Sequence, residues 1–249
     1  MAELRVFSRI DALAELEHLR TTGLNFDPEE LEHSRGSQWH IDDYRQPLSP
    51  ELPGSPVQDG SWEIAHRLAG AYEFADPSLV RAFFDPRDPP EERNMLLEID
   101  FWGLRIYAGV RADGIVDETR HEDGRAARVW KWRYRTLEGH FEMGQIDYEV
   151  WKWLDSGDVE FRIHAVSRPA KIDHLIVRFG FLVFGRRKQI EFAYKACVRM
   201  AELTSLVLNG ERNMVPAPTP DTNLVIHPQP NKQTAIEREV RRLRGMIRD

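Results

Sequence analysis

The sequence has one cysteine, Cys197, and no uninterrupted apolar run long enough to cross a membrane. A single cysteine excludes an internal disulfide and any cysteine-based zinc cluster, and it fits a reducing compartment. The most apolar stretch, residues 174–185, is shorter than a membrane span and is interrupted by Arg178. The first twenty residues carry early acids and lack the apolar core of a signal peptide. We therefore expect a cytoplasmic protein with no integral membrane segment.

An excess of positive charge is also missing. The 249 residues carry a formal net charge of -7, which argues against a phosphate backbone as the main partner. Metal-ligand spacing is absent as well, because His33, His40, Asp42 and Asp43 match no familiar ligand set. We expect no metal and no cofactor. With 41% hydrophobic and 30% charged residues, the composition is that of a globular protein.

The first sixty residues divide into a short helix and an irregular arm. Apolar residues at a spacing of three predict an amphipathic helix over residues 9–20. Residues 21–60 are rich in proline, glycine, serine and acids and have no sustained period. We expect this arm, within the segment 1–60, to lie over the core without forming a domain of its own.

Two short segments follow the arm. We interpret SWEIAHRLAGA, residues 61–71, as a strand. We interpret DPSLVRAFF, residues 76–84, as a short helix, because Asp76 has the chemistry of an N-cap and Pro77 suits the first helical position.

Turn dipeptides then punctuate a long region of β character. Asp113-Gly114 and Asp123-Gly124 are strong hairpin signals, and the sequence DSGD at 155–158 predicts a further turn. The segments between these turns predict an antiparallel meander of about five or six strands.

A long helix is predicted after Pro169, which ends the last strand. A stripe at helical spacing supports it, formed by Ile190, Ala193, Cys197, Ala201, Thr204 and Leu208. Residues 211–233 predict a Pro-rich linker, and 234–249 a basic amphipathic helix that docks on the domain or mediates self-association. The fold class indicated for residues 61–210 is α+β of the helix-grip type, in which a curved antiparallel sheet wraps around a long C-terminal helix.

Aromatic and cationic residues alternate in RVWKWRYR, residues 128–135. In a strand, this places Trp130, Trp132 and Tyr134 on one face and the cations on the other. The strand that follows has the same alternation, with Ile146, Tyr148 and Val150 on one face and Asp147 and Glu149 on the other. A binder of single-stranded nucleic acid needs its rings and cations in one groove, so this divergence argues against that function. The inner rings either fill a solid core or line a pocket.

Two further tryptophans, Trp151 and Trp153, fall on the acid-bearing face of the second strand. We expect the N-terminal arm or helix to cover them. Otherwise they form an exposed patch for a partner.

A family resemblance is carried by Tyr134, Thr136, Leu137, Glu138, Gly139, His140, Glu142 and Gly144. With Ser167 to Ala170 and with Gln189, Phe192 and Ala193, this run resembles the signature of an uncharacterised family named domain of unknown function nineteen-ninety. The resemblance covers roughly residues 24–208 and implies the helix-grip superfamily of START domains and pollen-allergen-like proteins, with no established reaction. Two positions depart from the family pattern: Arg135 stands where glycine is usual, and Gln145 where glutamate is usual.

His140 is the first candidate for chemistry. It lies between Glu138 and Glu142, and a carboxylate beside an imidazole could orient it as a general base. The alternative is a bulge at Gly139-His140 in which the imidazole bonds to backbone. The catalytic candidates are therefore His140, Glu138 and Glu142, and the sequence leaves open whether the protein is an enzyme.

Arg168 is the second candidate. It either closes a pocket over a ligand anion or pairs with an acid such as Glu138 or Glu142. The leading hypothesis is a binding protein for an apolar or amphipathic small molecule, held between the sheet and the long helix. The alternatives are an enzyme with His140 as acid and base, and an interaction module whose core is filled. The predicted ligand-binding residues are Trp130, Trp132, Tyr134, Tyr148, His140 and Arg168.

Overall fold

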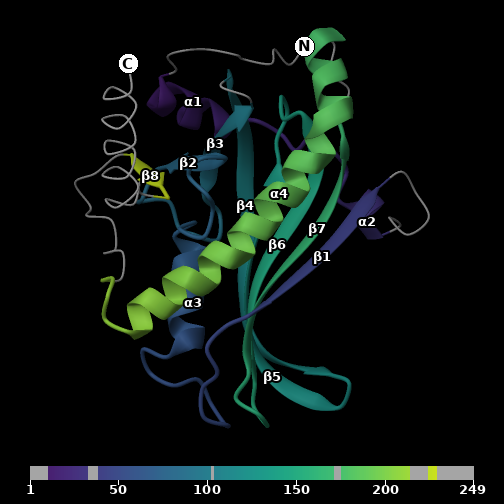
Figure 1. The fold of residues 1–249 in the computed structure, drawn as a ribbon. Coiled ribbons are helices and arrows are strands. Elements are labelled where there is room, and N and C mark those ends of the chain that lie inside the picture. The colour runs from purple at the N-terminus through teal and green to yellow at the C-terminus, as the bar shows by residue number, and fades with distance from the viewer. Residues whose placement is uncertain (1–10, 33–38, 102–103, 171–174, 214–223, 229–249) are drawn as a thin grey trace, which may run out of the picture.

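The computed structural model describes residues 11–32, 39–101, 104–170, 175–213 and 224–228; at residues 101, 104 and 175–185 it describes the backbone alone. Within these ranges the chain forms four helices and one eight-stranded sheet (Figure 1). All neighbouring strands are antiparallel, and their order is β1-β7-β6-β5-β4-β3-β2-β8. The elements are α1 (Ala12–Leu19), α2 (Glu29–Glu32), β1 (His40–Pro47), α3 (Ser61–Gly70), β2 (Val80–Phe84), β3 (Asn94–Phe101), β4 (Leu104–Glu122), β5 (Arg125–Thr136), β6 (Glu142–Trp153), β7 (Val159–Pro169), α4 (Leu175–Leu208) and β8 (Val225–His227).

The long helix α4 runs diagonally across one face of the curved sheet, and α3 packs between the C-terminal half of α4 and the sheet (Figure 1). This arrangement confirms the predicted α+β helix-grip fold. The N-terminal helix is also confirmed: Asp11 caps it by accepting a hydrogen bond from the backbone of Ala14, and Leu16 and Leu19 are buried.

The strand predicted for residues 61–71 is wrong, because this segment forms the helix α3. Trp62, Ala65 and Leu68 are buried at a spacing of three, which places them on one side of a helix. Glu63 and Arg67, four residues apart, form an ion pair at 3.1 Å on its other side. Over so short a segment, some of the apolar residues also alternate as they would in a strand. Packing of the segment against α4 favours the helix.

The helix predicted for residues 76–84 is also wrong. Asp76 accepts hydrogen bonds from the backbone and side chain of Ser78, as an N-cap does. The helical turn that it begins is not continued by a second turn. Val80–Phe84 continues as strand β2, which pairs with β3. A run that ends in Val, Ala and two Phe residues suits a buried strand better than a helix.

One of the two predicted hairpins exists. Asp123 and Gly124 both have positive φ, 52° and 77°, as a two-residue turn between β4 and β5 requires. Asp113-Gly114 instead forms a bulge within the continuous strand β4, where the register shifts between Ala112 and Ile115. Asp113 uses this position to pair with Arg135 at 3.0 Å on the neighbouring strand.

Both edges of the sheet come from segments in which the sequence predicted no strand. Residues 40–47 of the expected irregular arm form β1, which pairs with β7 along its whole length. Val225–His227 of the expected linker forms β8 on β2, and His227 is buried there against Glu73. Both strands are polar or short, so neither has a periodic pattern that reveals it.

The alternation predicted for the two central strands is confirmed. Trp132 lies opposite Tyr148 on the face toward α3 and α4, and both side chains are fully buried. On the other face Arg133 lies opposite Asp147, and the two side chains are 2.6 Å apart. The cations of this strip therefore meet acids and do not share a groove with the rings.

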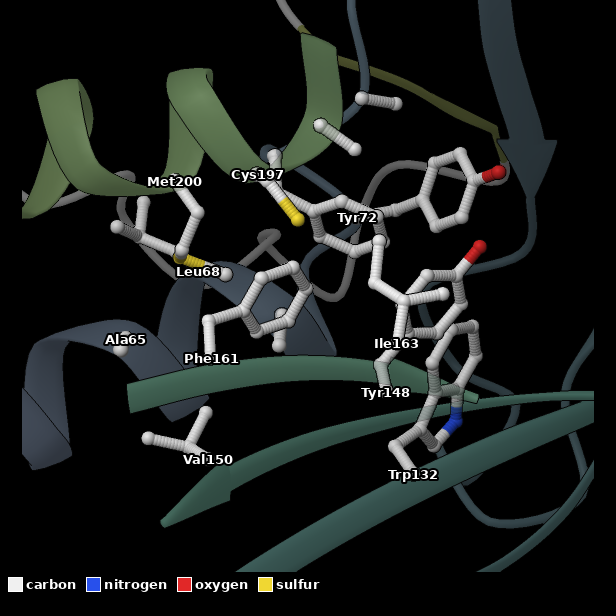
Figure 2. Packing of buried hydrophobic residues seen from close by; sticks show 14 of the residues in the cluster. Ala65, Leu68, Tyr72, Trp132, Tyr148, Val150, Phe161, Ile163, Cys197 and Met200 are labelled. Atoms are coloured by element: carbon white, nitrogen blue, oxygen red, sulfur yellow. The ribbon is translucent and has the colours of Figure 1, made fainter. Parts of the chain in front are cut away.

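The core between the sheet and the two helices is densely filled with rings. Figure 2 shows Cys197 and Met200 of α4 pointing toward Phe161 and Tyr148, which rise from the sheet. Tyr72 closes one side of this cluster and contacts Tyr148 with ring centroids 6.3 Å apart. Most of the space that the helix-grip arrangement encloses is thus occupied by side chains.

Arginines, not the N-terminal arm, cover Trp151 and Trp153 on the outer face of the sheet. The guanidinium of Arg162 lies 3.8 Å from the ring centroid of Trp151, and that of Arg125 lies 4.3 Å from Trp153. Both tryptophans are buried as a result, at 4% and 8% exposure. They do not form an exposed patch.

Two predictions concern segments that the structure describes only in part. Among the described helices, none combines the length and the apolar composition that crossing a membrane requires. The predicted helix at 234–249 lies outside the described residues.

Candidate functional site

A cavity of about 120 Å3 lies between β1, β5, β6, β7 and the middle of α4. Liquid water occupies about 30 Å3 per molecule, and an apolar cavity of about 150 Å3 accepts benzene, so this space suits roughly one ring. Its lining is formed by Asp42, Tyr44, Tyr134, Thr136, His140, Glu142, Met143, Gly144, Gln145, Ile146, Ile163, Ala165, Ser167, Gln189, Phe192 and Ala193.

A polar cluster forms one wall of the cavity. The side-chain amide of Gln189 on α4 donates a hydrogen bond to Oε1 of Glu142 and lies 3.4 Å from the hydroxyl of Ser167. Arg186, one turn earlier on α4, donates two hydrogen bonds to the carboxylate of Asp42 on β1. Segments far apart in the chain therefore assemble a carboxyl, an amide and a bidentate ion pair around one small space.

Glu142 has a perturbed carboxyl group. Burial raises its pKa to about 7, and the nearby charge of Asp42 acts in the same direction. The hydrogen bond from Gln189 and the charge of Arg186 oppose this rise but do not cancel it. At neutral pH the cavity therefore contains a carboxyl that is about half protonated.

His140 is buried at the same cavity, and its environment acts in the opposite direction. Burial lowers its pKa to about 4, so the imidazole is neutral at pH 7. Its Nδ1 lies 3.0 Å from the backbone nitrogen of Glu142 and 3.1 Å from the carbonyl oxygen of the same residue. The imidazole is thus bonded to backbone, as the alternative predicted, and not to a carboxylate, but Gly139 and His140 lie in the turn between β5 and β6 and not in a bulge.

Glu138 does not take part in the site. It is exposed, and its backbone nitrogen donates to the carbonyl of Gly23 at 2.9 Å. Of the two carboxylates that flank His140 in sequence, only Glu142 lines the cavity.

Asn25 explains much of the signature motif around the β5–β6 turn. Its side-chain amide donates to the carbonyl of Glu142 at 2.7 Å, and its side-chain oxygen accepts from the hydroxyl of Thr136, also at 2.7 Å. The backbone nitrogen of Gly144 donates to the same hydroxyl at 2.9 Å. A Cβ at Gly144, whose φ is +149°, would lie 2.1 Å from the carbonyl oxygen of Val166. The motif therefore fixes the backbone that carries Glu142 toward the cavity.

Arg168 pairs with an acid, as its structural alternative predicted, but the acid is not one of the two glutamates expected. Its guanidinium pairs with Glu30 at 2.7 Å and lies 4.3 Å from the ring centroid of Trp39. Glu30 and Trp39 come from the N-terminal arm, so Arg168 fastens this arm to β7. It neither lines the cavity nor pairs with Glu138 or Glu142.

The predicted aromatic residues separate into core and cavity. Tyr134 lines the cavity, and the hydroxyl of Tyr148 behind it donates to the Tyr134 hydroxyl at 3.3 Å. Trp132 is sealed in the core, with its indole nitrogen donating to the carbonyl of Pro90. Trp130 stacks on His66 of α3. Three of the four rings therefore serve as packing.

The helix stripe is confirmed at some positions and not at others. Ala193 and Cys197 are buried, as their place on the stripe predicts, and burial raises the pKa of the Cys197 thiol to about 11. Ile190, in contrast, is 44% exposed and faces away from the sheet. Within the described part of the chain, no group of three or more His, Cys, Asp or Glu side chains could hold a metal ion.

Sequence reasoning missed several residues of the site. Tyr44 and Asp42 lie on an edge strand that the sequence did not predict, and no local pattern links Arg186 to Asp42. Gln189 did carry a signal, because it belongs to the family signature. Only its contact with Glu142, 47 residues away in the chain, shows what it does.

Comparisons with known proteins agree with the signature. The model of the family described as Domain of unknown function (DUF1990) matches residues 27–197. No curated protein matches the chain. Solved structures do match, among them one described as "Crystal structure of Ara h 8.0201", with 9% identity and a TM-score of 0.41 over 69% of this chain and 99% of that one. Because the family model spans more than half of its length, this chain belongs to the family of the Domain of unknown function (DUF1990).

Proposed function

We propose that the protein binds one small amphipathic molecule in the cavity beneath the middle of α4. The observation that carries the proposal is the combination of an apolar wall with a single polar cluster around the same space. Ile146, Ile163, Phe192 and Ala193 supply the apolar wall, and Glu142 with its partners supplies the polar one. Binding sites for small molecules have this composition.

The volume limits the size of the ligand. Pockets for drug-sized molecules measure roughly 300–1,000 Å3, whereas this cavity measures about 120 Å3. The aromatic cluster around Tyr72 and Phe74 occupies the rest of the space between helices and sheet. A ligand with about one ring, or an alkyl chain of similar volume, fits.

The test is binding of one-ring probes to the full-length protein. Benzyl alcohol, benzylamine and benzoate would be titrated while protein amide shifts are followed by NMR. At least one probe should bind and shift amides around Ile163 and Ala193. Ala193→Leu, which fills the cavity, should weaken binding at least about tenfold, while Tyr194→Ala at the neighbouring exposed position should not. If no probe shifts cavity amides, or if Ala193→Leu binds as well as the wild type, the proposal is wrong.

A second candidate function, acid–base catalysis, rests on a different observation. Two titratable groups of one cavity have pKa values displaced in opposite directions, Glu142 upward and His140 downward. Such pairs occur at catalytic sites because they place a proton donor beside an acceptor near neutral pH. Exchange of the α protons of cyclohexanone in D2O, followed by NMR, tests this function. If the protein exchanges the protons faster than buffer does, and Glu142→Gln does not, the result supports acid–base catalysis. Exchange at the buffer rate excludes this function for this substrate class.

A further inference from the structure

We infer that the ligand is a small amine, bound as its ammonium ion with the carboxylate of Glu142 as its counter-ion. This inference rests on the proposed function and names the ligand class for the same cavity. It is based on the charges, the unused hydrogen-bonding capacity and the rings that surround Glu142.

The first argument is the charge of the cavity. Two carboxyl groups, those of Asp42 and Glu142, line it. Arg186 forms a bidentate ion pair with Asp42, so its charge is already matched. His140 is neutral because burial lowers its pKa to about 4. Among the described residues, Glu142 therefore has no cation of its own, and a buried carboxylate without one is costly.

The second argument is hydrogen bonding. Oε1 of Glu142 accepts from Gln189, and within the described part of the chain Oε2 has no hydrogen-bond partner. A carboxylate oxygen that borders a cavity accepts from a ligand N–H or O–H group and cannot donate once it is ionised. An ammonium group offers three such donors together with the missing positive charge.

The third argument is the ring environment. Tyr44, Tyr134 and Phe192 line the same cavity, so three aromatic side chains border the space that a cation would enter. Desolvated cations are attracted to such faces, and combinations of rings with a carboxylate are suited to ammonium ligands. The apolar wall around Ile163 then receives the body of the amine.

The alternative ligand class, a carboxylate or phosphate, meets the opposite environment. Arg168 pairs with Glu30 outside the cavity, and Arg186 is held by Asp42. An anion that entered would face Glu142 and Asp42 without a free cation among the described residues to receive it. Like-charge contact of this kind disfavours binding.

Binding of an ammonium ion is linked to loss of the Glu142 proton. The other charged or titratable groups around the cavity, within the described residues, are Asp42, Tyr44, Tyr134, His140 and Arg186. Burial raises the pKa values of both tyrosines above 10, so neither they nor His140 change charge between pH 6 and 8. Because the pKa of Glu142 is about 7, the affinity for an amine should rise roughly tenfold between pH 6 and 8.

The experiment compares benzylamine, benzyl alcohol and benzoate on the full-length protein by calorimetry and NMR at pH 6, 7 and 8. Benzylamine should bind at least about tenfold tighter than benzyl alcohol at pH 8, and benzoate most weakly. Glu142→Gln should abolish this preference and the pH dependence. Glu138→Gln, the exposed carboxylate two residues before His140, is the matched control and should change neither.

Each result decides between the two proposals. Equal binding of benzylamine and benzyl alcohol, or preferential binding of benzoate, overturns the amine inference and leaves the binding function intact. Absence of binding by all three probes overturns both. The pH dependence is measured on the wild type and therefore needs no variant. A benzylamine affinity that stays constant from pH 6 to 8 overturns the inference, even if Glu142→Gln fails to fold.

Discussion

Replacing Glu142 with glutamine should stabilise the protein in alkaline solution. The folded-state pKa of Glu142 is about 7, against an ordinary value of 4.5, because burial disfavours the carboxylate. A raised folded-state pKa means that folding favours the protonated form. The stability contributed by that proton is present below pH 4.5 and is lost as the pH rises through 7. Glutamine resembles the protonated carboxyl and cannot ionise.

The magnitude follows from the difference between the two pKa values, at about 1.36 kcal/mol per pH unit. Full ionisation of Glu142 costs the folded state about 3.4 kcal/mol. About 2.5 kcal/mol of this cost develops between pH 5 and 8.5. Glu142→Gln should therefore exceed wild type in stability by about 1 kcal/mol at pH 5 and by about 3 kcal/mol at pH 8.5.

Urea unfolding of both proteins at pH 5, 6, 7, 8 and 8.5 measures this difference. Titration of His140 affects both proteins equally and cancels in the comparison. Glu138→Gln, at an exposed position, should follow the wild type at every pH. A stability difference between Glu142→Gln and wild type that stays constant from pH 5 to 8.5 would refute the reasoning, because Glu142 would then titrate as a solvated carboxyl.

Three further predictions concern stability and use the same urea assay. Because burial lowers the pKa of His140 from 6.5 to about 4, wild-type stability should fall by up to about 3.4 kcal/mol as the pH drops from 7 to below 4. His140→Asn should lack this loss of stability. If His140→Asn and wild type lose stability equally with falling pH, the prediction is wrong. Lys152→Met leaves Glu51 buried without its 2.5 Å partner and should cost about 3–5 kcal/mol, against little change for Lys131→Met on the opposite face of the sheet. Gly144→Ala should cost on the order of 2 kcal/mol or more, because its Cβ meets a carbonyl oxygen, and a neutral result would show that β6 can move away from β7.

The central strands were predictable because their signal is local. Alternation over residues 128–135 fixes which side chains share a face, and the two hairpin partners β5 and β6 follow each other in the chain. Cross-strand pairs such as Trp132 with Tyr148 then satisfy both faces at once. Long strands with one apolar and one charged face leave little ambiguity of register.

Short segments were not predictable in the same way. The pattern predicts a strand at residues 61–71, which form the helix α3. It predicts a helix at residues 76–84, which end in the strand β2. In the first, Trp62, Ile64 and Leu68 alternate in sequence as in a strand, although burial of the adjacent Ile64 and Ala65 fits only a helix. Contacts with α4 and with β3 decide the structure of the two segments. The edge strand β1 was missed because its charged residues, which suit an open edge, hide its alternation.

The size and position of the cavity were also beyond the sequence. The pattern predicted a space between sheet and long helix, but Tyr72 and Phe74, which follow α3, fill most of it. Trp130 and Trp132 therefore pack in a core where a larger pocket was possible. Whether rings enclose a void depends on which segments pack above them, and no local pattern records this.

The sequence alone determined which residues of the central hairpin face inward, that His140 and Glu142 adjoin each other, and that one long helix follows the sheet. These are properties of neighbouring residues, which strand and helix periods set directly. The tertiary structure alone decided that Glu142 faces a cavity beside Gln189, while Arg186, 144 residues from its partner, neutralises Asp42. Protonation and ligand preference depend on burial and on charges brought from distant segments, and these exist only once the chain has folded.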